Sequence, residues 1–234
     1  MLYVEEQKEE IFHKFNSFLN AYQDIMPSRY FNFAVALFPL FLEKNLGPDL
    51  LMEIYHELDF DRYTHSYYYD QVEFIKNNFD ISGNIVDVAS GLFPCFANTL
   101  AIEQLKIKKG TITIYEPNLI STKPKHPNMI LKREAFDRSS NIDNVDLITG
   151  IMPCQATEII IRKACKNHKS FYIQLCNCNH FSQINTPNFI LNTNNQYHHY
   201  ICTLAAELVR QNNNGTFHMT NINNNPIPAI FNLK

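Results

Sequence analysis

Two acidic residues and a small-residue turn could bind a nucleotide. Asp87 lies at the end of one β-rich run and is followed by Ala89, Ser90 and Gly91, and Glu116 lies at the end of the next run. Small side chains let a ligand approach the backbone closely, and a carboxylate at a strand end can accept hydrogen bonds from both hydroxyls of a ribose. A tight turn without a ligand and a solvated carboxylate are the simpler alternatives.

The elements that must position these residues begin after Gly83. Short β-rich runs alternate with helical ones, which predicts right-handed βαβ units and a parallel sheet covered by helices. A last helix is followed by two strands joined by a short loop, which predicts an antiparallel hairpin. The expected strands are 85–88, 111–115, 129–132, 146–150, 171–176, 216–222 and 227–233, and the expected helices are 97–106, 156–166 and 197–211.

The first part of the chain has a different character. Residues 1–80 carry 14 acidic and 6 basic side chains, whereas residues 81–234 carry 9 acidic and 14 basic ones. Helical periodicity and turn signals predict an N-terminal helical region, with helices at 4–25, 29–45, 49–58 and 67–79. We therefore expect a helical region over 1–82 and an α/β domain over 83–234, divided near Ser82–Gly83.

The order of elements resembles the S-adenosylmethionine-dependent methyltransferase superfamily. That family has a Rossmann-like, seven-stranded sheet, mostly parallel, which closes with an antiparallel hairpin. Its first motif is an acidic residue followed by alternating glycines; Asp87 and Gly91 match it, whereas Ala89 and Phe93 stand where glycine is frequent. The resemblance implies an α/β fold and S-adenosylmethionine as cofactor, bound along Asp87, Ala89, Ser90 and Gly91, with Phe93 able to occupy space that the cofactor needs.

The same resemblance implies roles for residues after the next three strands. Glu116 would accept hydrogen bonds from the ribose, Asp137 would meet the adenine amino group, and Phe136 would pack on the adenine ring. Thr149 and Gly150 lie in the fourth strand, where the family places the methyl-accepting edge of the site.

The resemblance implies methyl transfer to an acceptor that is a small molecule or RNA. The Asn/Asp-Pro-Pro-Tyr/Phe signature of amino-group methylation is absent, and the catalytic residues stay unknown, although His180 or Asp87 could take a departing proton. Scattered lysines and arginines could form an RNA-binding face, and the acidic region 1–82 could cover a pocket or dock a basic protein. The alternative is a non-catalytic protein that keeps the fold for binding or as a scaffold. A nicotinamide oxidoreductase is disfavoured because the chain has no Gly-x-Gly-x-x-Gly.

A metal site is the other chemistry that the sequence raises. Cys176, Cys178 and His180 alternate along one predicted strand face, and thiolates and imidazoles bind zinc. No second ligand pair is obvious beyond Cys154, so we expect no metal and interpret the cysteines as small apolar residues of the core. We expect His198 and His199, at a helix start, to face solvent.

The chain has the composition of an ordinary globular protein, with 45% hydrophobic and 18% charged residues. Its early apolar run ends well short of the ~20 residues that span a bilayer, and its first ten residues are acidic, unlike a signal or transit peptide. We therefore expect a cytoplasmic protein without membrane association.

Overall fold

The computed structural model describes residues 60–91, 94–119, 123–176, 194–222 and 227–234. The chain divides into two compact units, Met1–Tyr67 and Tyr68–Lys234. The predicted helices of residues 4–58 lie outside the described residues, so the N-terminal helical region stays a prediction. Tyr68, Val72 and Ile75 are buried and belong to the same unit as the strands, which therefore begins ahead of Ser82–Gly83.

The described strands form one seven-stranded sheet of order β3-β2-β1-β4-β5-β7-β6. Strands β1 to β5 pair in parallel, and β7 is antiparallel to both β5 and β6. This order, with its reversed β7, confirms the predicted α/β, Rossmann-like sheet, which is mostly parallel and ends in an antiparallel hairpin. The strands are β1 (Asn84–Val88), β2 (Thr111–Tyr115), β3 (Met129–Lys132), β4 (Leu147–Ile151), β5 (Ser170–Gln174), β6 (Thr216–Thr220) and β7 (Ala229–Leu233).

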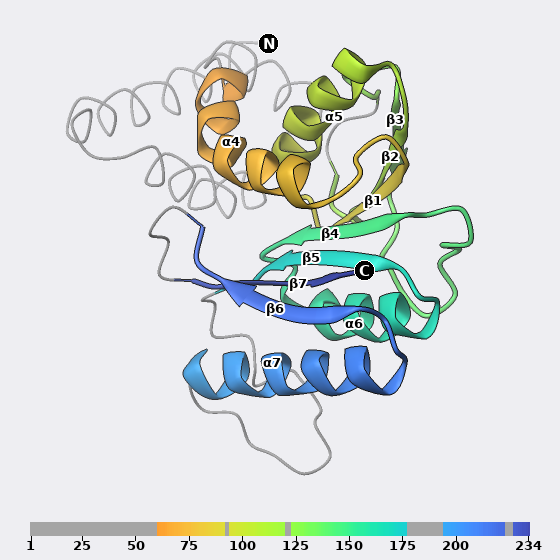
Figure 1. The fold of residues 1–234 in the computed structure, drawn as a ribbon. Helices are drawn as coiled ribbons and strands as arrows, with labels where there is room; N and C mark the ends of the chain where they lie inside the picture. Colours follow the sequence, from red (N-terminus) through yellow and green to blue (C-terminus); the bar gives the residue numbers. More distant parts are fainter. Residues whose placement is uncertain (1–59, 92–93, 120–122, 177–193, 223–226) are drawn as a thin grey trace, which may run out of the picture. The chain divides into compact units, whose positions relative to one another are not determined.

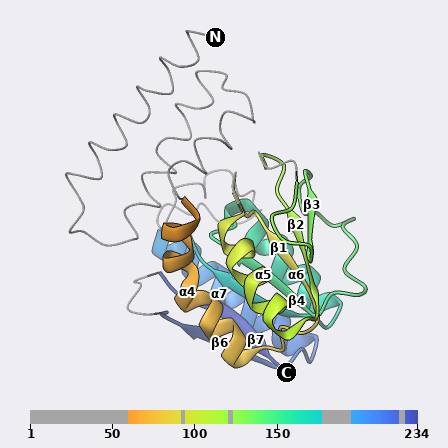
Figure 2. The ribbon, with the colours of Figure 1, turned by 90° about the horizontal axis from the view of Figure 1, so that it is seen from above.

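Helices cover both faces of the sheet (Figures 1 and 2). Helices α4 (Phe60–Asn78) and α5 (Cys95–Ile107) lie on one face, and α6 (Thr157–Lys166) and α7 (Asn194–Gln211) on the other. A 3-10 turn, η1 (Cys154–Ala156), precedes α6. The predicted helices 97–106, 156–166 and 197–211 are thus confirmed with slightly different ends, and the predicted helix 67–79 is the second half of α4.

The strands alternate their side chains between these two layers. Val86 and Val88 join the hydrophobic cluster that α6 and α7 cover, together with Ile160 and Ile201. Asp87 therefore points to the opposite face, the one beneath α4 and α5. The alternation of side chains therefore places the carboxyl group of Asp87 between the sheet and the layer of α4 and α5.

Two connections differ from a regular alternation of strands and helices. Parallel strands are usually joined by a helix, yet the described residues between β2 and β3 and between β3 and β4 form only turns and loops. Strand β3 is an edge of the sheet, and its Ile130 is 49% exposed. Loops therefore surround this end of the sheet.

Gln104 of α5 fastens that helix to the sheet. Its side chain is fully buried, and Nε2 donates to the carbonyl oxygens of Ile81 (2.9 Å) and Gly83 (3.0 Å), just before β1. Its Oε1 accepts a 3.1 Å hydrogen bond from Nδ2 of Asn128, just before β3. One amide therefore fixes the starts of two strands.

No helix in the described parts of the chain has the length and apolar character needed to span a bilayer.

Replacing Gln104 with Met tests this fastening. The change keeps the side-chain length but removes three hydrogen bonds and leaves one buried and one partly buried carbonyl without this donor, so the free energy of unfolding should fall by about 2–4 kcal/mol. Urea unfolding followed by circular dichroism measures it. Gln211→Met is the matched control, because Gln211 bonds to Glu207 at an exposed position and its loss should change stability by less than about 0.5 kcal/mol. Equal stability of the two variants would contradict the role of Gln104.

Candidate cofactor site

Asp87 is the centre of the candidate site. Only 1% of its surface is exposed. Its Oδ1 accepts a 2.8 Å hydrogen bond from Oγ1 of Thr149, which lies directly beside it in the β1–β4 pairing, and its Oδ2 accepts one from Oγ of Ser90. The carboxylate thus joins the turn after β1 to β4, and in this structure it positions the turn.

The turn after β1 uses left-handed backbone conformations. Ala89 has φ 58° and Gly91 has φ 73°, and the amide of Ala89 donates to the carbonyl oxygen of Tyr115 at 2.9 Å. Gly91 adopts this conformation freely, whereas Ala89 does so at a cost in free energy. A Cβ added at Gly91 would meet no described atom within 4 Å beyond its chain neighbours. Among the described residues, therefore, none packs against the Cβ position of Gly91, and Phe93 lies outside them.

Glu116 lies against the same turn. Its side chain is largely buried; Oε2 accepts a 3.1 Å hydrogen bond from the amide of Gly91, and Oε1 accepts a 2.8 Å bond from the amide of Asn118. Each carboxylate oxygen can accept two hydrogen bonds. Glu116 therefore fixes the turn and still has the capacity to accept from a diol.

Asp87 has a strongly perturbed pKa. The pKa of Asp87 is raised to about 7, chiefly by burial; the hydrogen bonds from Ser90 and Thr149 oppose the rise, and the nearby carboxylate of Glu116 adds a smaller contribution to it. The negative charge of Asp87 is therefore costly in the folded protein near neutral pH. A cation placed above the turn would lower that cost.

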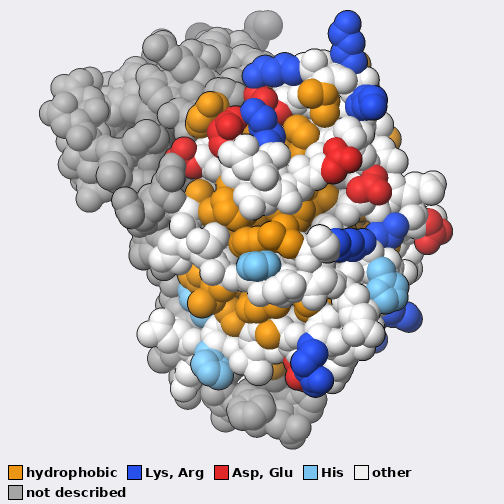
Figure 3. Space-filling model, viewed as in Figure 1, with side chains coloured by type: hydrophobic (Ala, Val, Ile, Leu, Met, Phe, Trp, Pro, Cys, Tyr) orange, Lys and Arg blue, Asp and Glu red, His pale blue; other side chains and the backbone are white. Residues whose placement is uncertain are grey.

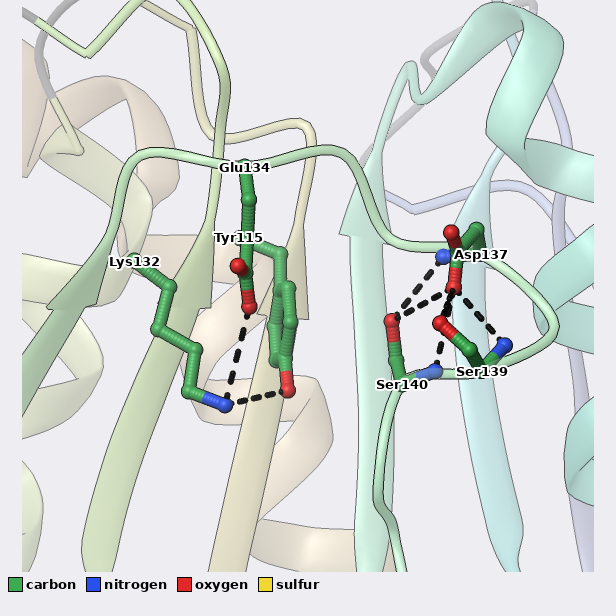
Figure 4. A network of polar contacts seen from close by, with 6 residues as sticks. All are labelled: Tyr115, Lys132, Glu134, Asp137, Ser139 and Ser140. Carbon is green, nitrogen blue, oxygen red and sulfur yellow. Dashed lines mark hydrogen bonds and ion pairs between the residues drawn. The ribbon is translucent and has the colours of Figure 1, made fainter.

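A second polar group lies at the ends of β2 and β3 (Figure 4). Nζ of Lys132 donates to the hydroxyl of Tyr115 at 2.7 Å, lies 4.6 Å above its ring centre, and lies 3.8 Å from Oε1 of Glu134. The bond to Tyr115 raises the pKa of Lys132. Sequence reasoning missed this group, because Tyr115 and Lys132 meet only through the β2–β3 register.

The structure does not gather all the expected residues at one point. Phe136 is buried and packs edge-on against Tyr115, with ring centres 5.3 Å apart. Asp137 is exposed and accepts hydrogen bonds from the amide and hydroxyl of Ser139, both at 2.7 Å (Figure 4), which lowers its pKa. Asp137 is engaged within its own loop and Phe136 is packed against β2, and their contacts to adenine stay a prediction.

Thr149 and Gly150 have different environments. Thr149 belongs to the Asp87 network. A Cβ on Gly150 would lie 3.0 Å from Cγ of Pro153 and 3.1 Å from Cδ1 of Ile160. Close packing against the start of α6 therefore explains this glycine without a ligand.

Two of the three residues considered as metal ligands lie outside the described part of the chain. Cys178 and His180 are outside the described residues, and no group of three potential ligands occurs within the described ones. The expectation for His198 was wrong: its side chain is half-buried, and Nε2 lies 2.8 Å from the carbonyl oxygen of Cys176. Helix α7 begins three residues earlier than expected, so His198 sits within its first turns. His199 is exposed, as expected.

Comparisons with known proteins add little to this geometry. No protein-family model matches the chain, and no curated protein matches it. One similar solved structure is described as a "putative methyltransferase from Thermoplasma acidophilum"; it is 12% identical, covers 65% of this chain and 68% of its own, and has a TM-score of 0.37. The fold assignment therefore rests on the strand order itself.

Asp87→Asn should remove a pH dependence of stability. The folded-state pKa of about 7 exceeds the ordinary 3.8, so the folded protein binds this proton more tightly. That contribution is complete below about pH 4 and is lost as pH rises through 7. Between pH 5 and 8 the free energy of unfolding of the wild type should fall by about 2–3 kcal/mol for this reason, and that of the variant should not show this fall.

Urea unfolding at pH 5, 6, 7 and 8 measures this difference. Asp143→Asn is the control, because Asp143 is exposed and its removal should leave the wild-type pH profile unchanged. Parallel profiles for wild type and Asp87→Asn would contradict a buried, titrating Asp87.

Proposed function

We propose that the protein binds S-adenosylmethionine and transfers its methyl group to a small molecule or an RNA. The observation that carries the proposal is the Glu116 carboxylate bonded to the amide of Gly91, at the carboxyl ends of β1 and β2, where no other described residue packs against the Cβ position of Gly91. Ligands of open α/β sheets bind at this edge, where the strand order reverses. Strand β1 lies at that point, between β2 and β4.

On this proposal, the chain's own residues divide the work of binding. Glu116 accepts hydrogen bonds from the ribose hydroxyls, and the turn through Ala89, Ser90 and Gly91 lets the ligand approach its backbone. Asp87 holds that turn from beneath and supplies a negative charge that a cationic ligand offsets. Asp137 and Phe136 would border the adenine.

The bound cofactor supplies an electrophilic methyl group on its sulfonium. The protein then has to align donor and acceptor and exclude water. Asp87 is a poor candidate for a base, because both of its oxygens accept internal hydrogen bonds. Thr149 lies next to it on β4, so the proposed acceptor side faces the loop after β4.

The acceptor class is a separate question. On the face seen in Figure 3, lysine and arginine side chains lie in separate groups around the margin, with hydrophobic side chains across the middle. An RNA-binding face requires clustered positive charge, which this face does not present, and both acceptor classes remain part of the proposal. The acidic region 1–82 is a candidate surface for a basic protein partner.

A non-catalytic scaffold is the second candidate function. Ala89 favours it, because a residue with a Cβ is held at φ 58° where the resembled family commonly has glycine. Under this alternative the turn keeps its shape for structural reasons, and the protein binds no S-adenosylmethionine.

Calorimetric titration with S-adenosylhomocysteine and S-adenosylmethionine separates the two candidates. We expect micromolar binding by the wild type and at least tenfold weaker binding by Glu116→Ala, because a hydrogen bond to a charged group contributes about 1.5–3 kcal/mol. Glu116→Gln keeps one carbonyl oxygen as an acceptor, so its affinity should lie between those of the wild type and Glu116→Ala. Glu134→Ala, at an exposed carboxylate on the next loop, should bind like the wild type.

Each result of the titrations supports a different candidate function. Absence of binding by folded wild type would refute the methyltransferase and support the scaffold. Binding of NADH without binding of S-adenosylhomocysteine would instead indicate an oxidoreductase. Because Glu116 also holds the turn, thermal unfolding of each variant must accompany the titrations.

A further inference from the structure

Two reduced cysteines face each other at the carboxyl ends of β4 and β5. Cys154 begins the turn η1 after β4, and Cys176 lies two residues beyond β5. Their Sγ atoms are 3.6 Å apart. Cys154 is partly exposed, whereas Cys176 is 5% exposed. The pair therefore has one accessible sulfur and one sheltered sulfur.

The backbone that presents Cys154 is strained. Met152 has φ 53° and Cys154 has φ 46°, and residues with side chains adopt such values at a cost in free energy. The amide of Met152 donates to the carbonyl oxygen of Gln174 at 2.8 Å. The hydroxyl of Tyr197 donates to the carbonyl oxygen of Cys154 at 3.3 Å. The turn is thus held to β5 and α7, with Cys154 directed at Cys176.

We propose that Cys154 and Cys176 are a redox modification site that closes to a disulfide when the protein meets a hydroperoxide. A disulfide needs a sulfur–sulfur distance of about 2.05 Å, so the two sulfurs must approach by about 1.5 Å. Rotation of the two cysteine side chains would supply this movement while the backbone contacts that hold the turn stay in place. The inference does not rest on the proposed function, because it requires only these two thiols and a peroxide.

The order of the chemistry follows from exposure. The sulfur of Cys154 attacks one peroxide oxygen; the O–O bond breaks, the thiol proton passes to the departing hydroxide, and water leaves behind a sulfenic acid. The sulfur of Cys176 then attacks the sulfenic sulfur; the S–O bond breaks, and its thiol proton leaves with the hydroxyl as a second water. Both sulfurs are oxidised and both peroxide oxygens are reduced. An external dithiol reverses the bond.

Oxidation would add a covalent link to the hydrogen bonds that already hold the turn after β4 to the end of β5. Gly150 and Thr149, the neighbour of Asp87, lie just ahead of this turn on β4. The disulfide would therefore limit movement at the edge where the candidate site lies.

The test treats the full-length protein with a few equivalents of hydrogen peroxide and counts thiols after denaturation. The wild type has six cysteines and should lose two thiols, which dithiothreitol restores. A non-reducing peptide map should show the Cys154 and Cys176 peptides joined, with two hydrogen atoms fewer. Cys154→Ser should lose none, and Cys176→Ser should instead carry a dimedone-reactive sulfenic acid at Cys154.

Cys202→Ser is the matched control, because Cys202 is also partly exposed and contacts the sulfur of Met219 at 3.6 Å. It should lose two thiols as the wild type does. A bond from Cys154 to Cys178, or an equal thiol loss in Cys154→Ser, would overturn the inference. If a serine variant fails to fold, the peptide map of the oxidised wild type decides by itself.

Discussion

The buried carboxylate of Asp87 is the interaction on which the site depends. It lies within the sheet, bonded to Ser90 on one side and Thr149 on the other. These bonds shape the turn that presents Gly91, and Gly91 in turn engages Glu116. Removing a carboxylate from water is unfavourable. The burial of Asp87 therefore lowers the stability of the folded protein, while its hydrogen bonds hold the ends of β1, β2 and β4 in one arrangement. Strongly perturbed pKa values cluster at functional sites, and structural networks produce them as well.

Much of the fold follows from local sequence patterns. The seven strands and the helices after residue 83 were predicted within a few residues, because alternation and helical periodicity are properties of neighbouring positions. The antiparallel hairpin at the end distinguished this sheet from other doubly wound sheets. The ends of elements differ more from the prediction; the predicted strand 171–176 ends at Gln174, two residues before Cys176.

The site was only partly predictable, since its contacts depend on register and packing. Asp87, Gly91 and Glu116 could be identified from their strand-end positions. The pairing of Lys132 with Tyr115, the burial of His198 and the approach of Cys154 to Cys176 each join residues far apart in the chain. Gly150 illustrates the reverse case, because a residue expected at a ligand is explained by packing against Ile160.

The helix-free connections around β3 have a consequence for how this protein can change. The strands and the four described helices supply most of the core of the sheet domain, and Phe136, Ile142 and Val145 of the β3–β4 segment join it. Most other described residues of the two helix-free segments are exposed at the surface. Loops tolerate substitution and insertion better than the elements they join. New ligand preferences could therefore evolve through these two segments, while Asp87 and the strand order stay fixed.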